Sequence, residues 1–255
     1  MGRVITRSVA GATDLELSGA VDLVNAGEDA GVTAGLEPIG IKITTDLGVL
    51  MAGGKAAVMV DFTSPLTVME NTHQALRHGV PAVVGTTGIG DDEMAEIERW
   101  VKRYGAGAIV APNFAIGAIL LMKAAQLCAR YMGAAEIIEM HHDQKIDAPS
   151  GTAYKTARLI SELSGGTTPP QDLHQLETVE KLAGVRGGRA FGVPVHSVRL
   201  PGMVAHQEVI FGGEGQVLTL RHDAINRDCF IPGLLIAIRR APGLKELVYG
   251  MENLI

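Results

Sequence analysis

The residues best suited to chemistry lie at positions 139–153, in the segment Glu-Met-His-His-Asp-Gln-Lys-Ile-Asp-Ala-Pro-Ser-Gly-Thr-Ala. It holds two adjacent histidines, His141 and His142, and a lysine, Lys145, four residues after the first of them. A histidine has an ordinary pKa of about 6.5 and can deliver a proton at neutral pH. A lysine would add a fixed positive charge beside it. The segment therefore predicts a site that binds an anion and supplies a proton.

The same segment ends in a turn that begins a helix. Ser150, Gly151 and Thr152 precede a helix expected over 153–163. The free backbone N–H groups at such a helix start form a binding site for a carboxylate or phosphate. Together with the histidines and the lysine, this turn suits a small dicarboxylate whose reaction needs an acid.

Two other interpretations of these residues stay open. A His-His-Asp cluster in a polar loop is often only solvated, and Ser-Gly-Thr before a helix is ordinary capping. A metal site would join His141, His142 and Asp143 to His206 or His222. These are suitable ligand types, but no standard ligand spacing is present, so we expect no metal.

Alternating strands and helices precede this segment from position 56 onward. Strands are expected over 57–62, 81–84 and 108–111, with one helix from Ser64-Pro65 to Arg77 and another from Asp91 to near Gly105. Two consecutive βαβ units with continuous apolar strands predict a parallel sheet that is covered on both faces.

Small residues follow two of these strands, at the edge where open α/β sheets bind ligands. They are Gly85, Thr86 and Thr87 after one strand, and Ala111, Pro112, Asn113 and Phe114 after the next. Small residues there let a flat ring approach the backbone, as a cofactor cleft requires, and the alternative, that these residues only form turns, stays open. Residues 15–22 show the pattern of a further strand ending in an acid, Asp22, and such an acid bonds the adenosine ribose in dinucleotide folds.

The pattern changes after Asn113, and a second region of α+β type is expected. Helices are expected over 116–132, 230–240 and 244–252, and strands over 193–200, 204–212 and 216–224, with a long loop over 164–188. Short Pro-Gly and Gly-Gly turns between the three strands predict an antiparallel meander.

Composition excludes several classes of protein. A chain of 255 residues, 47% of them hydrophobic, is long enough for two domains that each bury a core. The 22 Lys and Arg against 28 Asp and Glu give a net charge of −6, which argues against nucleic acid or an anionic membrane as a partner. Cys128 and Cys229 form no disulfide or zinc pattern, and the most apolar stretch, 105–122, is interrupted by Pro112. We therefore expect a cytoplasmic protein without a membrane span.

The chain strongly resembles the 4-hydroxy-tetrahydrodipicolinate reductase family, also called dihydrodipicolinate reductase. The matching stretches run in order along the chain: 60–63 (Val-Asp-Phe-Thr), 84–88 (Val-Gly-Thr-Thr-Gly), 111–114 (Ala-Pro-Asn-Phe), 141–152, 196–202 (His-Ser-Val-Arg-Leu-Pro-Gly) and 204–208 (Val-Ala-His-Gln-Glu). The resemblance implies a Rossmann-like dinucleotide-binding domain over 1–113 and 224–255. It also implies an α+β substrate domain over 114–223, with a mixed, largely antiparallel sheet, that builds a homotetramer.

The resemblance also implies an activity and a set of site residues. The family transfers a hydride from NADPH or NADH to the cyclic imine formed when hydroxy-tetrahydrodipicolinate loses water. By resemblance, His141 donates or accepts a proton and Lys145 donates one, while His142, Gly151 and Thr152 hold the substrate carboxylates. The cofactor-binding residues would be Met1, Asp22, Gly85, Thr86, Thr87, Ala111, Pro112, Asn113 and Phe114. An acid at Asp22, followed by no arginine, favours NADH or the use of both cofactors.

One departure from the family concerns the first residues. The family's phosphate-binding loop typically ends in Gly-Arg-Met-Gly, and this chain begins with Met1-Gly2-Arg3, followed by a first helix over 4–10. We expect a misassigned start or a shortened chain, with about 15 further residues in the natural protein. The corollary is weak binding of NADPH by the chain as written. Two other functions stay open: another two-domain NAD(P)-dependent dehydrogenase, or a non-catalytic binding or sensor protein of the same fold.

Overall fold

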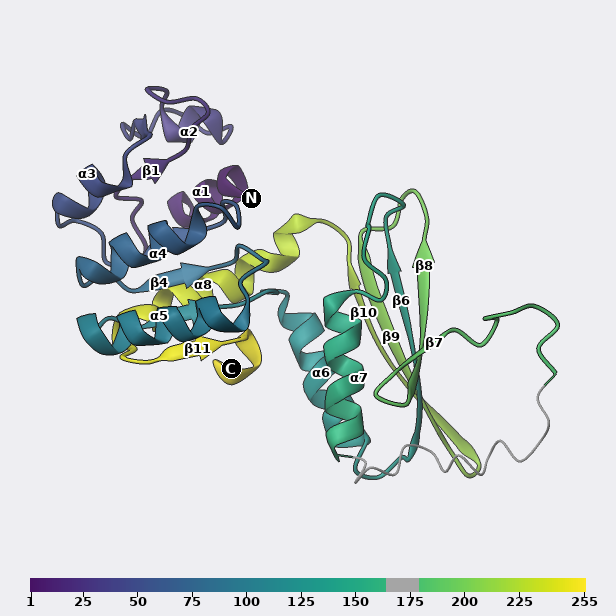
Figure 1. Ribbon diagram of the computed structural model, residues 1–255. Coiled ribbons are helices and arrows are strands. Elements are labelled where there is room, and N and C mark those ends of the chain that lie inside the picture. The colour runs from purple at the N-terminus through teal and green to yellow at the C-terminus, as the bar shows by residue number, and fades with distance from the viewer. Residues whose placement is uncertain (164–178) are drawn as a thin grey trace. The chain divides into compact units, whose positions relative to one another are not determined.

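The computed structural model describes residues 1–163 and 179–255 (Figure 1). These residues divide into two compact units. Unit 1 comprises Met1–Phe114 and Arg227–Ile255, and unit 2 comprises Ala115–Asn226. Most of the loop expected over 164–188 lies outside the described residues. Within the described ranges, no helix is long and apolar enough to cross a membrane.

Unit 1 is built around a parallel sheet in the order β11-β5-β4-β3, made of Leu247–Tyr249, Ala108–Val110, Ala82–Val84 and Met59–Asp61. A pair of short parallel strands, β1 (Ala20–Val21) and β2 (Ile43–Thr44), stands apart from it. The helices of unit 1 are α1 (Gly2–Ala10), α2 (Ala30–Thr33), α3 (Leu47–Ala52), α4 (Val68–Arg77), α5 (Asp91–Tyr104) and α8 (Ile231–Arg240). Three 3₁₀ turns complete the unit: η2 (Arg227–Phe230), η3 (Ala241–Gly243) and η4 (Met251–Asn253).

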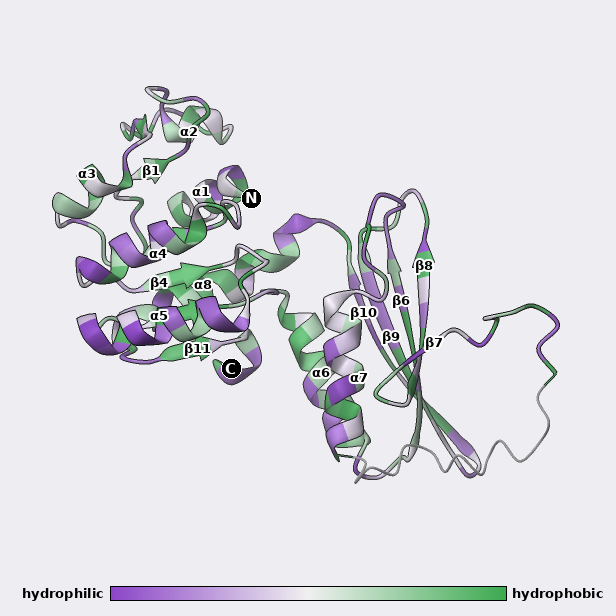
Figure 2. Ribbon diagram, in the orientation of Figure 1, coloured by the Kyte–Doolittle hydropathy of each residue, from purple (hydrophilic) through white to green (hydrophobic). Residues whose placement is uncertain are grey.

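Both faces of the four-stranded sheet are buried, as its continuous apolar strands predict. Side chains alternate between the two faces of a strand. Ala82 and Val84 therefore pack with α4 and α5 in one core, while Val83 points to the opposite face and is also fully buried. Figure 1 shows α8 across that second face, and Figure 2 shows β4 and β11 in the colour of apolar residues.

Unit 2 is a five-stranded mixed sheet with two helices on one face. The sheet order is β10-β9-β6-β8-β7, made of Gln216–Ala224, Ala205–Gly213, Ala134–His141, Val193–Arg199 and Gly188–Ala190. The helices are α6 (Ile116–Cys128) and α7 (Gly151–Leu163). Alternate residues of β6 and β9, such as Ile137, Val209 and Phe211, are fully buried against these helices. The expected α/β class, with one parallel and one mixed sheet, is confirmed.

The expected meander is wrong in its first half. β9 and β10 do form an antiparallel hairpin, but β6 lies between β8 and β9. It pairs parallel with β8 and antiparallel with β9. The short Pro-Gly turn predicts a hairpin of β8 and β9. A turn sequence carries no information about β6, which lies earlier in the chain and pairs with both strands.

Several element boundaries also differ from expectation. Residues 244–252 form β11 flanked by 3₁₀ turns instead of a helix, because this segment completes the parallel sheet beside β5. The strand expected over 15–22 is reduced to Ala20–Val21. The helix expected to start at Ser64-Pro65 begins at Val68 after a turn, and α6 ends at Cys128, before the expected Gly133.

Candidate active site

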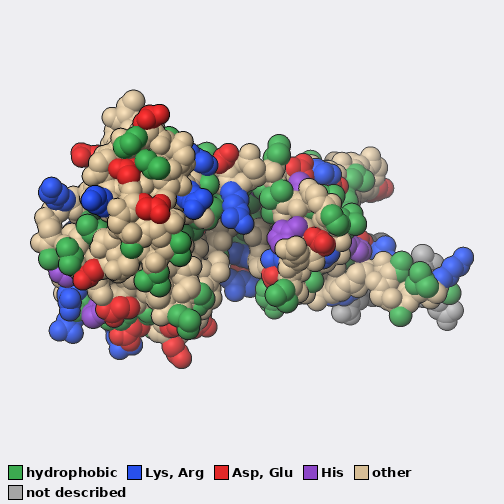
Figure 3. Space-filling model, turned by 90° about the horizontal axis from the view of Figure 1, so that it is seen from above, with side chains coloured by type: hydrophobic (Ala, Val, Ile, Leu, Met, Phe, Trp, Pro, Cys, Tyr) green, Lys and Arg blue, Asp and Glu red, His purple; other side chains and the backbone are tan. Residues whose placement is uncertain are grey.

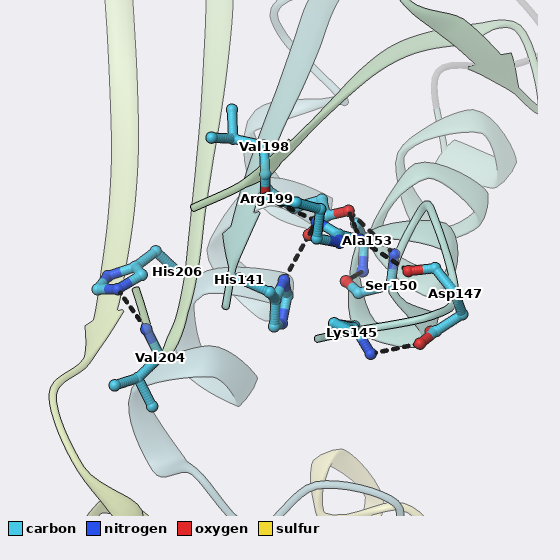
Figure 4. A network of polar contacts seen from close by, with 10 residues as sticks. His141, Lys145, Asp147, Ser150, Ala153, Val198, Arg199, Val204 and His206 are labelled. Carbon is cyan, nitrogen blue, oxygen red and sulfur yellow. Dashed lines mark hydrogen bonds and ion pairs between the residues drawn. The ribbon is translucent and has the colours of Figure 1, made fainter. Parts of the chain in front are cut away.

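His141 is placed by the end of strand β6, and a buried carboxylate holds its ring. Glu139 and His141 are two residues apart on this strand, so their side chains leave on the same face. Glu139 Oε2 lies 2.5 Å from His141 Nδ1 (Figure 4). The carboxylate is fully buried, whereas the histidine side chain is 15% exposed. The ring of His141 is therefore partly exposed, whereas the Glu139 carboxylate that holds it is buried inside unit 2.

A second side chain fixes the carboxylate. Arg199 lies opposite His141 on the neighbouring strand β8. Its Nη1 donates to Glu139 Oε2 at 3.0 Å and its Nη2 donates to Glu139 Oε1 at 2.7 Å. Burial raises the pKa of Glu139, but hydrogen bonds from His141, Arg199 and Ser197 lower it more, so the pKa is about 2. Glu139 is therefore a carboxylate at neutral pH.

The charge of Glu139 determines which nitrogen of His141 carries the proton. A carboxylate only accepts hydrogen bonds, so Nδ1 must be the donor in this pair. Nε2 has no hydrogen bond to any residue in the described part of the chain. In the neutral ring, Nε2 is thus an unprotonated acceptor at the exposed edge, and in the charged ring it is a proton donor.

Lys145 lies in the turn that follows β6. Its Nζ donates to Asp147 Oδ1 at 2.7 Å, and this hydrogen bond, with the lysine charge, holds the pKa of Asp147 below its usual range. The lysine side chain is 22% exposed. Arg199 Nη2 also donates to the backbone oxygen of Asp147 at 2.7 Å, which connects the turn to the Glu139–Arg199 ion pair. Figure 4 shows the contact of Lys145 with Asp147 as a dashed line, in the same network as His141 and Arg199.

The first turn of α7 completes the group. Ser150 Oγ accepts from the N–H of Ala153 at 3.2 Å, so Ser150 caps this helix. The N–H of Ser150 donates to Glu139 Oε1 at 3.3 Å. Gly151 is exposed, and a Cβ added there would meet nothing within 4 Å. The structure thus brings His141, Lys145, Gly151 and Thr152 together around the Glu139–Arg199 ion pair, with His142 exposed immediately after β6.

The residues weighed for a metal site have other surroundings. His206 Nδ1 lies 2.7 Å from Asp223 Oδ1, and the N–H of Val204 donates to His206 Nε2 at 3.2 Å. His222 packs on the backbone of Gly117, and burial lowers its pKa. Among residues 1–163 and 179–255, no cluster of three or more His, Cys, Asp or Glu could hold a metal ion.

Unit 1 has polar side chains where its strands end. Asp61 closes β3 and is buried; Thr86 Oγ1 donates to its Oδ1 at 2.6 Å and Asn71 Nδ2 to its Oδ2 at 2.8 Å. The N–H of Thr63 donates to both Asp61 Oδ1 and Thr86 Oγ1. These bonds link the carboxyl ends of β3 and β4, so the loop with Gly85, Thr86 and Thr87 is held at the edge where open α/β sheets bind ligands.

Family models match nearly the whole chain. The model described as the N-terminus of dihydrodipicolinate reductase matches residues 1–114, and the one for its C-terminus matches residues 117–255. The chain belongs to the dihydrodipicolinate reductase family.

Individual relatives agree with this family. The 4-hydroxy-tetrahydrodipicolinate reductase of Moorella thermoacetica is 49% identical, over 100% of this chain and 94% of the relative. That of Desulfitobacterium hafniense is 48% identical with the same coverage. A dipicolinate-bound dihydrodipicolinate reductase from Paenisporosarcina sp. TG-14 is 42% identical, with a TM-score of 0.86 over 100% of this chain and 95% of that one. An amine dehydrogenase from Mycobacterium smegmatis, 13% identical with a TM-score of 0.62 over 98% and 93% of the two chains, shares the fold alone.

In this dihydrodipicolinate reductase chain, a glycine is required after β4. A Cβ on Gly85 would lie 2.2 Å from Cζ of Phe62, whose ring packs 5.6 Å from that of Phe114. We expect Gly85→Ala to lower the free energy of unfolding by about 1–3 kcal/mol, because the ring must move. Urea unfolding followed by circular dichroism measures this. Gly133→Ala is the control, since a Cβ there meets nothing within 4 Å; equal losses in the two variants would contradict the prediction.

The low pKa of Glu139 predicts how this reductase responds to acid. Folded Glu139 has a pKa of about 2, against an ordinary value of 4.5, so between these values only the unfolded chain is protonated at this residue. Stability should therefore fall as the pH drops from 4.5 to 2, with Glu139 contributing a slope of at most about 1.4 kcal/mol per pH unit. Urea unfolding at several pH values should show a shallower slope in Glu139→Gln. The same slope in both proteins would contradict the assignment.

The sequence pattern alone assigns no role to Glu139 or Arg199. Glu139 is the first residue of the His141 segment, and Arg199 lies in one of the stretches that match the family. The available signal was the alternation of β6, which places residue 139 on the face of residues 135 and 137. An acid in a buried position of a strand calls for a cationic partner, and that partner lies 60 residues later in the chain.

Proposed function

We propose that this chain reduces 4-hydroxy-tetrahydrodipicolinate to tetrahydrodipicolinate with NADPH or NADH, in the biosynthesis of diaminopimelate and lysine. The observation that carries the proposal is the Glu139-held His141 beside Lys145 and the start of α7, in a chain 49% identical to a 4-hydroxy-tetrahydrodipicolinate reductase. Reduction of a dicarboxylate imine needs an anion site and a proton source, and the residue types in this cluster support both roles.

The carboxylates of the substrate are assigned to Lys145, His142 and the first turn of α7. The backbone N–H groups of Gly151 and Thr152 begin that helix, where the helix dipole favours an anion. Gly151 presents its backbone without a side chain. Lys145 adds a full positive charge, so two negative groups of a small ring can be neutralised here without a metal ion.

His141 and Lys145 are assigned to proton transfer. Loss of water from the hydroxy acid leaves a conjugated cyclic imine, and addition of a hydride to it requires one proton to balance the charge. His141 Nε2 is free of other hydrogen bonds within the described residues, and its Nδ1 is held by Glu139. Glu139 therefore fixes the ring with Nδ1 as the donor, and Nε2 is the atom that transfers the proton. Lys145 stabilises the negative charge of the ring, and the one proton that the ring needs comes from His141 Nε2 or from the Lys145 ammonium.

The residues of unit 1 fit a nicotinamide dinucleotide, which supplies the hydride when bound. The first turn of α1 has no acidic residue and holds the exposed Arg3, as suits a phosphate group, and Met1 precedes this turn. Asp22 directly follows β1; its Oδ1 accepts from the N–H of Val24, which leaves Oδ2 for a ribose hydroxyl. The nicotinamide side is assigned to the strand-end residues, Gly85, Thr86, Thr87, Ala111, Pro112, Asn113 and Phe114.

The test is oxidation of NADPH or NADH followed at 340 nm, with substrate generated enzymatically in the same cuvette. We expect oxidation that depends on both protein and substrate and is inhibited by dipicolinate, the planar dicarboxylate bound in the Paenisporosarcina structure. Oxidation with another class of substrate would favour a different dehydrogenase. Binding of dipicolinate without any oxidation would favour a non-catalytic binding protein.

Assembly and location complete the proposal. We propose a homotetramer built by unit 2, whose sheet carries α6 and α7 on one face only and exposes Val217 and Leu218 on β10. Light scattering after gel filtration tests the assembly. We expect four times the chain mass of 26.8 kDa, and a monomer would contradict the proposal.

A cytoplasmic location follows from the biosynthetic role and is tested by fractionating cells. Figure 3 shows histidine side chains on the surface of unit 2, on the right of the view.

A further inference from the structure

We propose that Glu139 and Arg199 act as one positioning unit that fixes three parts of the substrate site at once. Neither side chain is assigned to the substrate itself. The proposal rests on the function proposed above, because its three parts are the groups assigned there to proton transfer and to the carboxylates.

The first connection is to the proton-transfer group. Glu139 Oε2 accepts from His141 Nδ1 at 2.5 Å, which selects the tautomer with an unprotonated Nε2 at the surface. Without this carboxylate, the ring could turn and either nitrogen could carry the proton. The pair thus determines which atom of His141 faces the reacting molecule.

The second and third connections are to the backbone. Arg199 Nη2 donates to the carbonyl oxygen of Asp147 at 2.7 Å, and Asp147 Oδ1 in turn holds Lys145 Nζ at 2.7 Å. Glu139 Oε1 accepts from the N–H of Ser150 at 3.3 Å, at the start of α7. The lysine turn and the helix start are therefore fixed to the same pair of side chains.

The planar fork of arginine is suited to this task. Two of its nitrogens contact both carboxylate oxygens, and they also reach the carbonyl oxygens of Val198 and Asp147. Its Nε is buried and has no partner in the described part of the chain, so the two outer nitrogens make all of these contacts. A lysine at this position would keep the charge but could not make the paired contacts with the same geometry.

Unit 2 provides a matched control on the same strand. Glu136 also accepts from one arginine and one histidine, with Arg186 Nη2 at 2.6 Å and His196 Nε2 at 2.8 Å. Both of its partners are partly exposed, and neither contacts the lysine turn or the start of α7 through a bond of this kind. Glu136→Gln and Arg186→Lys therefore make the same chemical changes outside the proposed unit.

The experiment compares Glu139→Gln and Arg199→Lys with these two controls. We expect Glu139→Gln to lower kcat by about 10- to 100-fold with little change in KM, because the ring of His141 is no longer fixed. Arg199→Lys should mainly raise KM and the Kd for dipicolinate, by about 10-fold, because the turn and the helix start lose their support. The controls should stay within about 2-fold of the parent in all three constants.

A spectroscopic measurement separates positioning from a general loss of structure. Nitrogen-15 NMR of the parent protein, at a pH where the ring is neutral, should show the Nδ1–H tautomer of His141, and Glu139→Gln should lose it. If Glu139→Gln does not fold, the double variant Glu139→Gln/Arg199→Met leaves no buried charge and carries the same test.

Retention of the tautomer and of kcat in the folded variants would overturn the proposal, as would equal losses in the Glu136 control. The proposed function fails in a different way, since the parent protein would then not oxidise NADPH or NADH. The tautomer of His141 and the affinity for dipicolinate would still report on the positioning unit in that case.

Discussion

His141→Asn is expected to lower kcat by about 100- to 10,000-fold, the range that a positioned proton-transfer group contributes. Asparagine keeps a polar group near Glu139 but cannot transfer a proton as an imidazole does, so one of the two assigned proton-transfer groups is lost. The Kd for dipicolinate should change little, because the carboxylates are assigned to Lys145 and α7. Steady-state kinetics and isothermal titration calorimetry measure the two effects.

His196→Asn is the matched control for this variant. His196 is also held by a glutamate, with Nε2 2.8 Å from Glu136 Oε2, and it lies on the neighbouring strand β8. Its replacement should leave kcat within about 2-fold of the parent value. A His141→Asn enzyme that keeps more than a tenth of the parent kcat would show that another group transfers the proton.

Lys145→Met is expected to lower kcat/KM by about 1,000-fold, because it removes a binding charge and a proton donor at once. A hydrogen bond to a charged group contributes about 1.5–3 kcal/mol, so the Kd for dipicolinate should rise by about 10- to 100-fold. Lys145→Arg separates the effect of the positive charge from that of the proton donor. It keeps the charge and should restore part of the affinity, but its guanidinium does not release a proton, so kcat should stay low.

Lys102→Met controls for the loss of a lysine that pairs with a neighbouring acid. Lys102 Nζ lies 2.6 Å from Glu98 Oε1 on α5, on the surface of unit 1. Exposed pairs of this kind contribute little to stability or function, so kcat/KM should not change. Unaltered affinity for dipicolinate in Lys145→Met would show that the carboxylates bind elsewhere.

The parts of the fold that depend on local pattern could be predicted from the sequence. The apolar runs over 57–62, 81–84 and 108–111 predicted a parallel sheet, and Gly105 marked the end of the helix α5, where its φ of 69° is left-handed. Each of these signals lies within a few residues of the element that it defines, so no knowledge of distant contacts was needed.

The parts that depend on distant pairing could not be predicted in this way. β11 is a strand because it pairs with β5 in the parallel sheet, although its sequence has a helical pattern. β6 lies between β8 and β9 because the buried face of the sheet selects that order. The segment around His141 is contiguous, so its chemistry could be predicted from the sequence. Its support by Glu139 and Arg199 could not, because it depends on the pairing of β6 with β8.

The central claim is that this chain transfers a hydride from a nicotinamide cofactor to a cyclic dicarboxylate. Mass spectrometry of the product formed with cofactor carrying two deuterium atoms at C4 tests it most directly. One deuterium should pass to each tetrahydrodipicolinate molecule, which raises its mass by one unit relative to the product of unlabelled cofactor. Unlabelled product, or no product at all from the folded parent protein, would contradict the account.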